Sequence, residues 1–335
     1  MTEKIPCWVG IDTSNYTTSA ALVIPDPERA GQLTVVSNRK APLPVTAGAR
    51  GLRQSDALFV HTRNLPELMR GIRADMAVAG LYPVAVGCST RPRDAADSYM
   101  PCFLAGVAAA EAFAAGADLP LYRLSHQSGH IMAALYSSGA LYRARTAGQS
   151  LEGEFLAFHV SGGTTEAVVA HPVEGGFSVE LVGYGADLHA GQVVDRVGVM
   201  LGLDFPCGAA LERLAVTCTE KLPPVKLSVK DGVCNLSGFE NQAAKLWKNT
   251  GDPSLVAAWV LTALGRTLRR MTDQIQAERE TSLPVLYAGG VMSNRFIRPL
   301  LTEGAAWECL FSEPAYSADN AAGVALLTAE GYLSK

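Results

Sequence analysis

This sequence lacks closely spaced cysteine pairs, an excess of charge of one sign and long apolar runs. Its seven cysteines never stand in CxxC spacing, and an odd, scattered set indicates neither a zinc ribbon nor a disulfide framework. Lys plus Arg number 28 and Asp plus Glu number 32, giving a formal net charge of -4. This balance excludes a basic nucleic-acid coat protein, so any RNA contact needs a local basic patch or a partner.

A membrane-crossing or secretory segment is also missing from the sequence pattern. The first residues hold no apolar region of signal-peptide length. The longest apolar stretch, 100–117, is interrupted by Glu111, and 255–265 is shorter than the ~20 residues that cross a bilayer. Reduced thiols are the plain interpretation of the cysteines, so we expect a cytoplasmic protein with no membrane contact.

What is present is enough apolar sequence for a large folded core. The 335 residues are 48% hydrophobic and 18% charged, against about 25% charged in an average protein. This composition excludes disorder, indicates extensive buried or interface surface, and at this length predicts about two domains. Two strand–turn–strand units roughly 150 residues apart further suggest a duplicated lobe. The predicted units are 8–11, the turn 12–17 and 18–24, then 155–160, the turn 161–164 and 166–170.

Helical patterns alternate with these strands, which predicts the α/β class. We expect helices over 58–79, with a kink or break at Pro66, and over 103–115 and 256–278. Asp252 and Pro253 provide an N-cap and a first-turn proline for the last of these helices. A buried strand over 283–287 should precede a glycine pair and a helix near Asn294, while 225–236 is less regular.

The sharpest local signal is a histidine pair at 126 and 130. Residues four apart share a helix face, so both imidazoles could reach one metal ion. The alternative is two ordinary helix histidines with Ser125 as N-cap. A zinc peptidase of the HExxH type needs Glu at position 127, and this chain has Gln127, which argues against that hydrolysis. With only six histidines in the chain, a carboxylate is the expected third ligand.

Three further segments could carry chemistry. Ser161–Thr164 and Ala288–Asn294 contain paired glycines, which let backbone N–H groups approach an anion or open space at a helix start. Their alternatives are a simple hairpin turn and close strand–helix packing. Asp319, in the segment 316–323, is either a helix N-cap or a displayed carboxylate ligand.

Together these segments resemble one known family, the TsaD type of tRNA adenosine threonylcarbamoyltransferase, formerly called O-sialoglycoprotein endopeptidase or glycoprotease. The resemblance covers nearly the whole chain, and six ordered motifs are far more specific than any one of them. The motifs are Asp12-Thr13-Ser14, the His126/His130 pair, Val160–Gly163, Asp195-Arg196 with Leu201–Gly208, Ala288-Gly289-Gly290 with Asn294, and Asp319–Ala322.

The resemblance implies two actin-like, RNase-H-like lobes with a nucleotide and metal cleft between them. The expected lobes are 1–122 plus 312–335, and 123–311. The implied metal ligands, for one iron or zinc ion, are His126, His130 and Asp319. The implied nucleotide and substrate residues, for ATP, ADP, AMP or an acyl-adenylate, are His159, Val160, Ser161, Gly162, Gly163, Asp195, Gly208, Glu212 and Asn294. Asp12 and Ser14 are the implied catalytic residues.

The implied reaction transfers a threonylcarbamoyl group from its adenylate to N6 of an adenosine in tRNA. The implied partners are a TsaB-like paralogue, an ATPase and tRNA, with a homo- or heterodimer expected. Five arginines in one N-terminal stretch could contact RNA, although a solvated helix face is the favoured interpretation of them. They are Arg50, Arg53, Arg63, Arg70 and Arg73.

Several positions depart from the family pattern. Two carboxylates of the first turn are replaced by Tyr16 and Thr17, and Ser128 replaces a third between the histidines. The remaining departures are Thr164 for histidine, Gln192 for glutamate, Cys207 for glycine, and a segment 91–100 without the family's Gly-Pro-Gly loop.

Because the ligand-type residues remain, we expect the chain to bind metal and nucleotide. Because several acidic residues are missing, we expect weak transfer of the threonylcarbamoyl group, unless Asp12 or Asp187 compensates. The alternatives are a regulatory paralogue without turnover and another carbamoyl- or phosphoryl-transferring enzyme on the same fold. A metallopeptidase is disfavoured.

Overall fold

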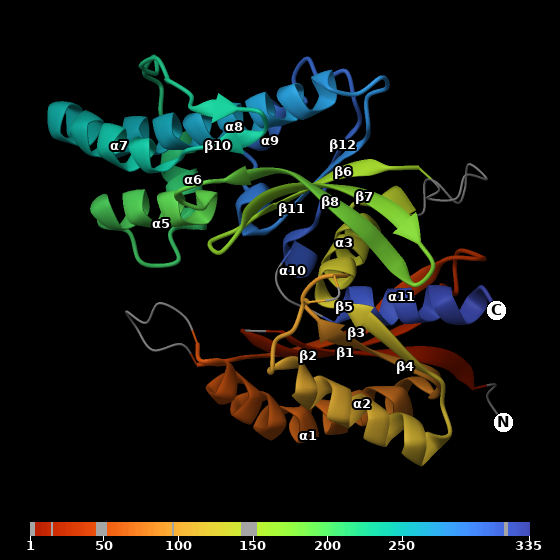
Figure 1. Ribbon diagram of the computed structural model, residues 1–335. Coiled ribbons are helices and arrows are strands. Elements are labelled where there is room, and N and C mark those ends of the chain that lie inside the picture. Colours follow the sequence, from red (N-terminus) through yellow and green to blue (C-terminus); the bar gives the residue numbers. More distant parts are fainter. Residues whose placement is uncertain (1–3, 15, 45–51, 96, 142–152, 318–320) are drawn as a thin grey trace. The chain divides into compact units, whose positions relative to one another are not determined.

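The computed structural model describes residues 4–14, 16–44, 52–95, 97–141, 153–317 and 321–335 (Figure 1). Its contacts divide the chain into two compact units. Unit 1 comprises Met1–Leu151, Pro172–Ser178 and Ala318–Lys335, and unit 2 comprises Glu152–His171 and Val179–Ser317. The sequence prediction divides the chain after residue 122, whereas these contacts group residues 123–151 with unit 1.

Unit 1 is built on a sheet with the strand order β3-β2-β1-β4-β5. The strands are β1 (Ile5–Ser14), β2 (Thr17–Pro25), β3 (Leu33–Pro42), β4 (Leu81–Arg91) and β5 (Leu121–Ser125). β2 is antiparallel to β1 and to β3, while β4 is parallel to β1 and to β5. The predicted turn over 12–17 is mostly strand, since Asp12 pairs with Ser19 and Ser14 with Thr17. β-Branched threonines favour this extended pairing, which places Asp12 inside the sheet.

Helices pack on both faces of this sheet (Figure 1). They are α1 (Gln54–Ala79), α2 (Phe103–Ala117), α3 (His126–Ser137) and α11 (Ala322–Leu333). Because both faces are covered, β1 is a nearly continuous buried run, from Cys7 to Ser14. Gly10 lets α11 approach β1 closely, since a Cβ there would lie 2.5 Å from the backbone nitrogen of Ala325. Helix α1 continues through Pro66, so the predicted break does not occur.

Unit 2 is built on a sheet with the strand order β12-β11-β6-β7-β8-β10-β9. The strands are β6 (Phe155–Val160), β7 (Thr165–Val173), β8 (Gly176–Gly185), β9 (Val229–Lys230), β10 (Val233–Cys234), β11 (Val285–Ala288) and β12 (Cys309–Phe311). The irregular stretch predicted over 225–236 contains only the two shortest of these strands. β11 is parallel to both β6 and β12, with Ala288 opposite His159.

The core of unit 2 forms around one long helix. The helices are α5 (Ala190–Met200), α6 (Gly208–Val216), α7 (Ser237–Thr250), α8 (Pro253–Ala277), the 3-10 helix η1 (Gly290–Ser293), α9 (Arg298–Thr302) and α10 (Pro314–Ser317). α8 is buried along most of its length. Its predicted cap is confirmed, because the Asp252 carboxylate accepts hydrogen bonds from the backbone N–H groups of Ser254 (2.8 Å) and Leu255 (3.2 Å). Across the part of the chain that the structure describes, no helix is both long and apolar enough to cross a membrane.

Candidate functional site

The histidine pair lies in the first turns of α3 in unit 1. Ser125 caps this helix, as its hydroxyl accepts a hydrogen bond from the backbone N–H of Ser128 at 3.1 Å. The rings of His126 and His130 face one another edge to face, with centroids 4.3 Å apart. The i, i+4 spacing therefore brings two nitrogen donors together, as the sequence predicts.

Asp12 connects this pair to the sheet. Its carboxylate is fully buried on β1 and lies 3.0 Å from Nδ1 of His126. It also accepts hydrogen bonds from the hydroxyls of Ser14 (2.7 Å) and Ser89. Burial raises the pKa of Asp12, but the charge and hydrogen bond of His126 and the two hydroxyls outweigh burial and hold that pKa below its usual value. Asp12 is therefore an ionised carboxylate in contact with the first histidine of the pair, His126.

Two imidazoles suit zinc or iron, so the donor chemistry fits the implied metal. Among the described residues no cluster of three His, Cys, Asp or Glu side chains is found, and Asp319, the implied third ligand, lies outside them. His126 and His130 would hold the ion together with Asp319.

Ser128 does not take part in this pair. It lies two residues from each histidine, and residues at that spacing do not share a helix face. Its hydroxyl instead contacts the Asp94 carboxylate (3.1 Å) and accepts a hydrogen bond from the backbone N–H of Phe177 (3.2 Å). The carboxylate that the family carries at this position would therefore point away from the histidines of this chain.

Unit 2 contains a cavity of about 310 Å³. Its lining residues are Ser161, Gly162, Gly191, Val194, Asp195, Pro206, Gly208, Ala209, Glu212, Gly290, Val291, Ser293 and Asn294. They come from the β6–β7 turn, from α5 and α6, and from the segment after β11. Gly289 shapes this last segment, because its φ of 99° and its contact with Val160 leave no room for a Cβ. Four segments far apart in the sequence therefore converge on one cavity.

Polar groups are placed to orient a ligand in this cavity. One oxygen of Asp195 accepts from the backbone N–H of Cys207 (2.8 Å), and one oxygen of Glu212 accepts from that of Arg295 (2.8 Å). The side-chain oxygen of Asn294 accepts from the backbone N–H of Phe296 at 2.9 Å. These bonds fix two carboxylates, which can accept from hydroxyl groups, and one amide, which can donate. A ligand with hydroxyl groups and a further hydrogen-bond acceptor would match these groups.

The structure brings together most of the residues implied for the nucleotide. Ser161, Gly162, Asp195, Gly208, Glu212 and Asn294 all line the cavity. His159 and Val160 instead lie on β6, where Val160 is buried, and Gly163 lies in the turn beyond the lining set. Gly191 and Ser293 also line the cavity. The resemblance does not assign them to the ligand, although Ser293 lies in the glycine segment 288–294 and Gly191 directly precedes Gln192.

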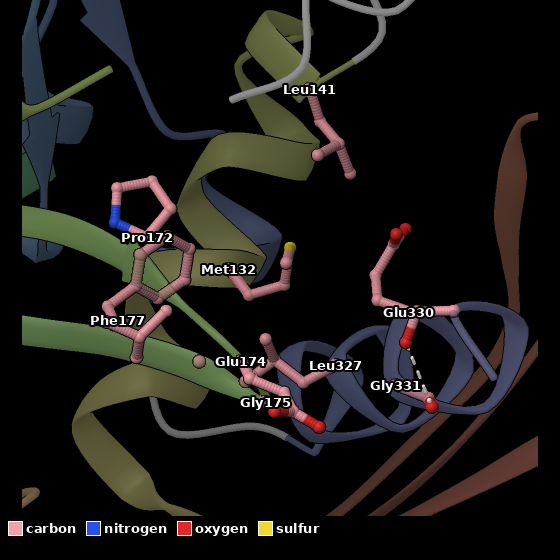
Figure 2. Close-up of a pocket in the computed structure, with 12 residues that line it drawn as sticks. Met132, Leu141, Pro172, Glu174, Gly175, Phe177, Leu327, Glu330 and Gly331 are labelled. Atoms are coloured by element: carbon pink, nitrogen blue, oxygen red, sulfur yellow. Dashed lines mark hydrogen bonds between the residues drawn. The ribbon is translucent and has the colours of Figure 1, made fainter. Parts of the chain in front are cut away.

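A second cavity, of about 370 Å³, lies within unit 1 and contains none of the residues implied by the resemblance. Figure 2 shows Met132 of α3, Leu327 of α11 and Phe177 of the β7–β8 hairpin around it. Its lining is largely apolar, with glutamates 174 and 330 among its residues. It offers few groups to orient a polar ligand, in contrast to the cavity of unit 2.

Asp187 is a candidate to compensate for the missing acids, but its carboxylate binds backbone groups of the protein. Its carboxylate accepts hydrogen bonds from the backbone N–H groups of Leu236 (2.7 Å) and Ser237 (3.1 Å) at the start of α7. Burial raises its pKa, but the hydrogen bonds from Ser237, Leu236 and Leu188 outweigh this and leave the pKa lowered. Asp187 therefore caps α7 as an ionised group.

We expect Asp187→Ala to lower the free energy of unfolding by about 1 kcal/mol, the usual effect of losing a helix cap. Because the folded-state pKa is lowered, this stabilisation is complete above the unfolded pKa and disappears as the pH falls through the folded one. Urea titrations at neutral and acidic pH measure the difference between wild type and variant. A difference that grows on acidification would contradict this role.

Comparisons with known proteins identify the family of this chain. The family model described as "TsaD: tRNA N6-adenosine threonylcarbamoyltransferase" matches residues 99–326. A tRNA N6-adenosine threonylcarbamoyltransferase of Thermus thermophilus is 30% identical over 95% of this chain and 91% of its own. The enzyme of that name from Maricaulis maris is 28% identical over 96% of this chain and 85% of its own.

Two solved structures resemble the chain in fold alone. A xylulose kinase from Rhodospirillum rubrum has a TM-score of 0.55 at 12% identity, covering 97% of this chain and 90% of its own. HypF of T. kodakarensis has a TM-score of 0.55 at 13% identity, covering 99% of this chain and 48% of its own. The predicted α/β fold with two actin-like lobes is confirmed. With its family model matched over most of the sequence, the chain belongs to the TsaD family of tRNA N6-adenosine threonylcarbamoyltransferases.

Proposed function

We propose that this chain binds an adenine nucleotide and one metal ion, and that its reaction is the transfer of a threonylcarbamoyl group from the adenylate to N6 of adenosine in tRNA. The cavity of unit 2 carries this proposal. Six residues that the family resemblance assigns to the nucleotide line that one cavity, although they are spread from Ser161 to Asn294. Family membership supplies the reaction.

Different residues of the cavity bind different parts of the nucleotide. Asp195 and Glu212 accept hydrogen bonds from ribose hydroxyls, and the Asn294 amide donates to the base. The glycine turn is held in shape by the backbone N–H of Gly163, which donates to the Ser161 hydroxyl at 3.3 Å. A turn fixed in this way presents its backbone to phosphate or acyl oxygens without reorganising, and positioning of this kind lowers the barrier to transfer.

His126, His130 and Asp319 would hold the metal ion, which would supply Lewis-acid chemistry toward phosphate or acyl oxygens. On the sheet side, the Asp12 carboxylate contacts one of these ligands, His126. The exposed arginines of α1, among them Arg63, Arg70 and Arg73, are the proposed tRNA contact. A TsaB-like paralogue and an ATPase are the proposed partners, in a homo- or heterodimer.

We expect purified wild-type protein to carry one ion per chain and His130→Ala to carry almost none after dialysis, because one of two adjacent imidazole donors is lost. Elemental analysis of both proteins measures this. His171→Ala is a matched control, since His171 lies in unit 2 and pairs with Glu154 at 3.1 Å. Equal metal content in wild type and His130→Ala would refute the site.

We also propose that transfer by this chain is weak. The two carboxylates of the family's first turn are absent, and their positions hold Tyr16, whose side chain is 42% exposed, and Thr17. The carboxylates of Asp12 and Asp187 already bind groups of the protein itself. The same observations favour a second candidate function, a regulatory paralogue that binds metal and nucleotide without turnover.

A further inference from the structure

Both oxygens of the Asp12 carboxylate are occupied by protein donors. Oδ1 contacts Nδ1 of His126 at 3.0 Å and accepts from the Ser89 hydroxyl, while Oδ2 accepts from the Ser14 hydroxyl at 2.7 Å. The side chain has no exposed surface. An acid in this setting cannot reach a substrate proton without giving up a buried hydrogen bond, a loss that is costly for a charged group. The catalytic assignment that the resemblance implies for Asp12 therefore fits poorly with its surroundings.

The contact with His126 has a definite chemical consequence. An ionised carboxylate only accepts hydrogen bonds, so Nδ1 of His126 must be the donor. The neutral ring then carries its proton on Nδ1 and its lone pair on Nε2. Phe103, with its ring centroid 6.0 Å from that of His126, is a further neighbour of this ring. One hydrogen bond from the sheet therefore selects both the tautomer and the direction in which His126 presents its lone pair.

We propose that Asp12 is a positioning residue: it holds His126 as the Nδ1–H tautomer, with Ser14 and Ser89 fixing the carboxylate, so that Nε2 is the nitrogen offered to the metal. A carboxylate behind a ligating histidine raises the basicity of the ring and fixes its orientation. This role deepens the metal-binding part of the proposed function and rests on it. The tautomer itself is a property of the metal-free protein.

The first experiment measures the tautomer directly. Long-range ¹H–¹⁵N correlation spectra of the metal-free, chelator-treated full chain distinguish Nδ1–H from Nε2–H, at a pH where the rings are neutral, with His126→Ala assigning the signals. We expect Nδ1–H for His126 in the wild type and a shift toward Nε2–H in Asp12→Asn, whose amide can donate to Nδ1. A wild-type His126 protonated on Nε2 overturns the proposal, whether or not the variant folds.

The second experiment measures Zn²⁺ affinity by competition with a chromophoric chelator. We expect Asp12→Asn to bind Zn²⁺ about 10- to 100-fold more weakly, as found for carboxylates behind ligating histidines. Asp94→Asn is the matched control. It removes a carboxylate at the start of the same helix, where Asp94 accepts from Ser125 (2.7 Å) and Ser128, and it leaves His126 untouched.

The outcomes separate the two proposals. If Asp94→Asn changes the His126 tautomer as much as Asp12→Asn does, the effect comes from disturbing α3, and the positioning role of Asp12 is refuted. If Asp12→Asn binds Zn²⁺ with wild-type affinity, its effect on the metal is refuted. If the wild type shows the Nδ1–H tautomer but binds no Zn²⁺, the metal-binding part of the proposed function fails, while the contact between Asp12 and His126 stands.

Discussion

Replacing Gly162 by valine should weaken adenine-nucleotide binding by up to about 100-fold, because the new side chain enters the cavity that we propose for the nucleotide. A Cβ at Gly162 meets no protein atom within 4 Å, so the variant should fold normally and place its methyl groups in open space. Filling space that a ligand needs costs up to about 3 kcal/mol, which corresponds to roughly 100-fold in affinity. Calorimetry with ATP, ADP and AMP on metal-replete protein measures the loss.

Gly163→Val is the matched control, since it adds the same side chain to the next residue of the same turn. Gly163 also has open space around it but does not line the cavity. Its variant should therefore bind nucleotide nearly as the wild type does. If both variants bind nucleotide equally weakly, the loss comes from a change in the whole turn. If Gly162→Val binds nucleotide with wild-type affinity, the proposed nucleotide site is refuted. Absence of binding in the wild type would refute the nucleotide proposal itself.

The two glycines also show how far the sequence can predict this site. On sequence alone the resemblance assigns Gly162 and Gly163 equally to the ligand, and valine at Gly163 would be expected to block binding. They are distinguished by the cavity, which Gly162 lines together with residues of α5 and α6 and which Gly163 does not line. Such a distinction depends on contacts between distant segments, which no local pattern encodes.

Elements whose causes are local follow well from the sequence. The Asp252 cap and the first-turn Pro253 mark the start of α8 at Pro253, three residues before the apolar pattern that predicts 256–278, because both act within one helical turn. The pattern of the polar segment 12–17 predicts a turn, and this prediction is wrong for residues 12–14 and 17 because cross-strand pairing with β2 outweighs local turn preference. This pairing also affects the metal site. Because Asp12 is part of a strand, it is buried and contacts His126, which lies 114 residues away in the sequence.

Because the first turn lacks the family's two carboxylates, we expect wild-type transfer of threonylcarbamoyl to tRNA to be about 100- to 10,000-fold slower than that of a family member with the intact acidic turn. Loss of a positioned acid or base typically has an effect of this size. Asp12 cannot substitute, because its carboxylate is buried and bonded to His126, Ser14 and Ser89. A transfer assay reconstituted with the TsaB-like and ATPase partners measures the rate.

The double change Tyr16→Asp, Thr17→Glu should restore part of the lost rate. Tyr16 is exposed and Thr17 half-buried at the start of β2, so acidic side chains fit there without displacing the core. The double change Tyr16→Asn, Thr17→Gln is the control, since it has nearly the same shape without the charge. Rescue by the acids alone ties the loss to the missing carboxylates, because side-chain size is matched between the two variants. Wild-type turnover equal to that of the intact enzyme would show that this family member needs no acid in its first turn.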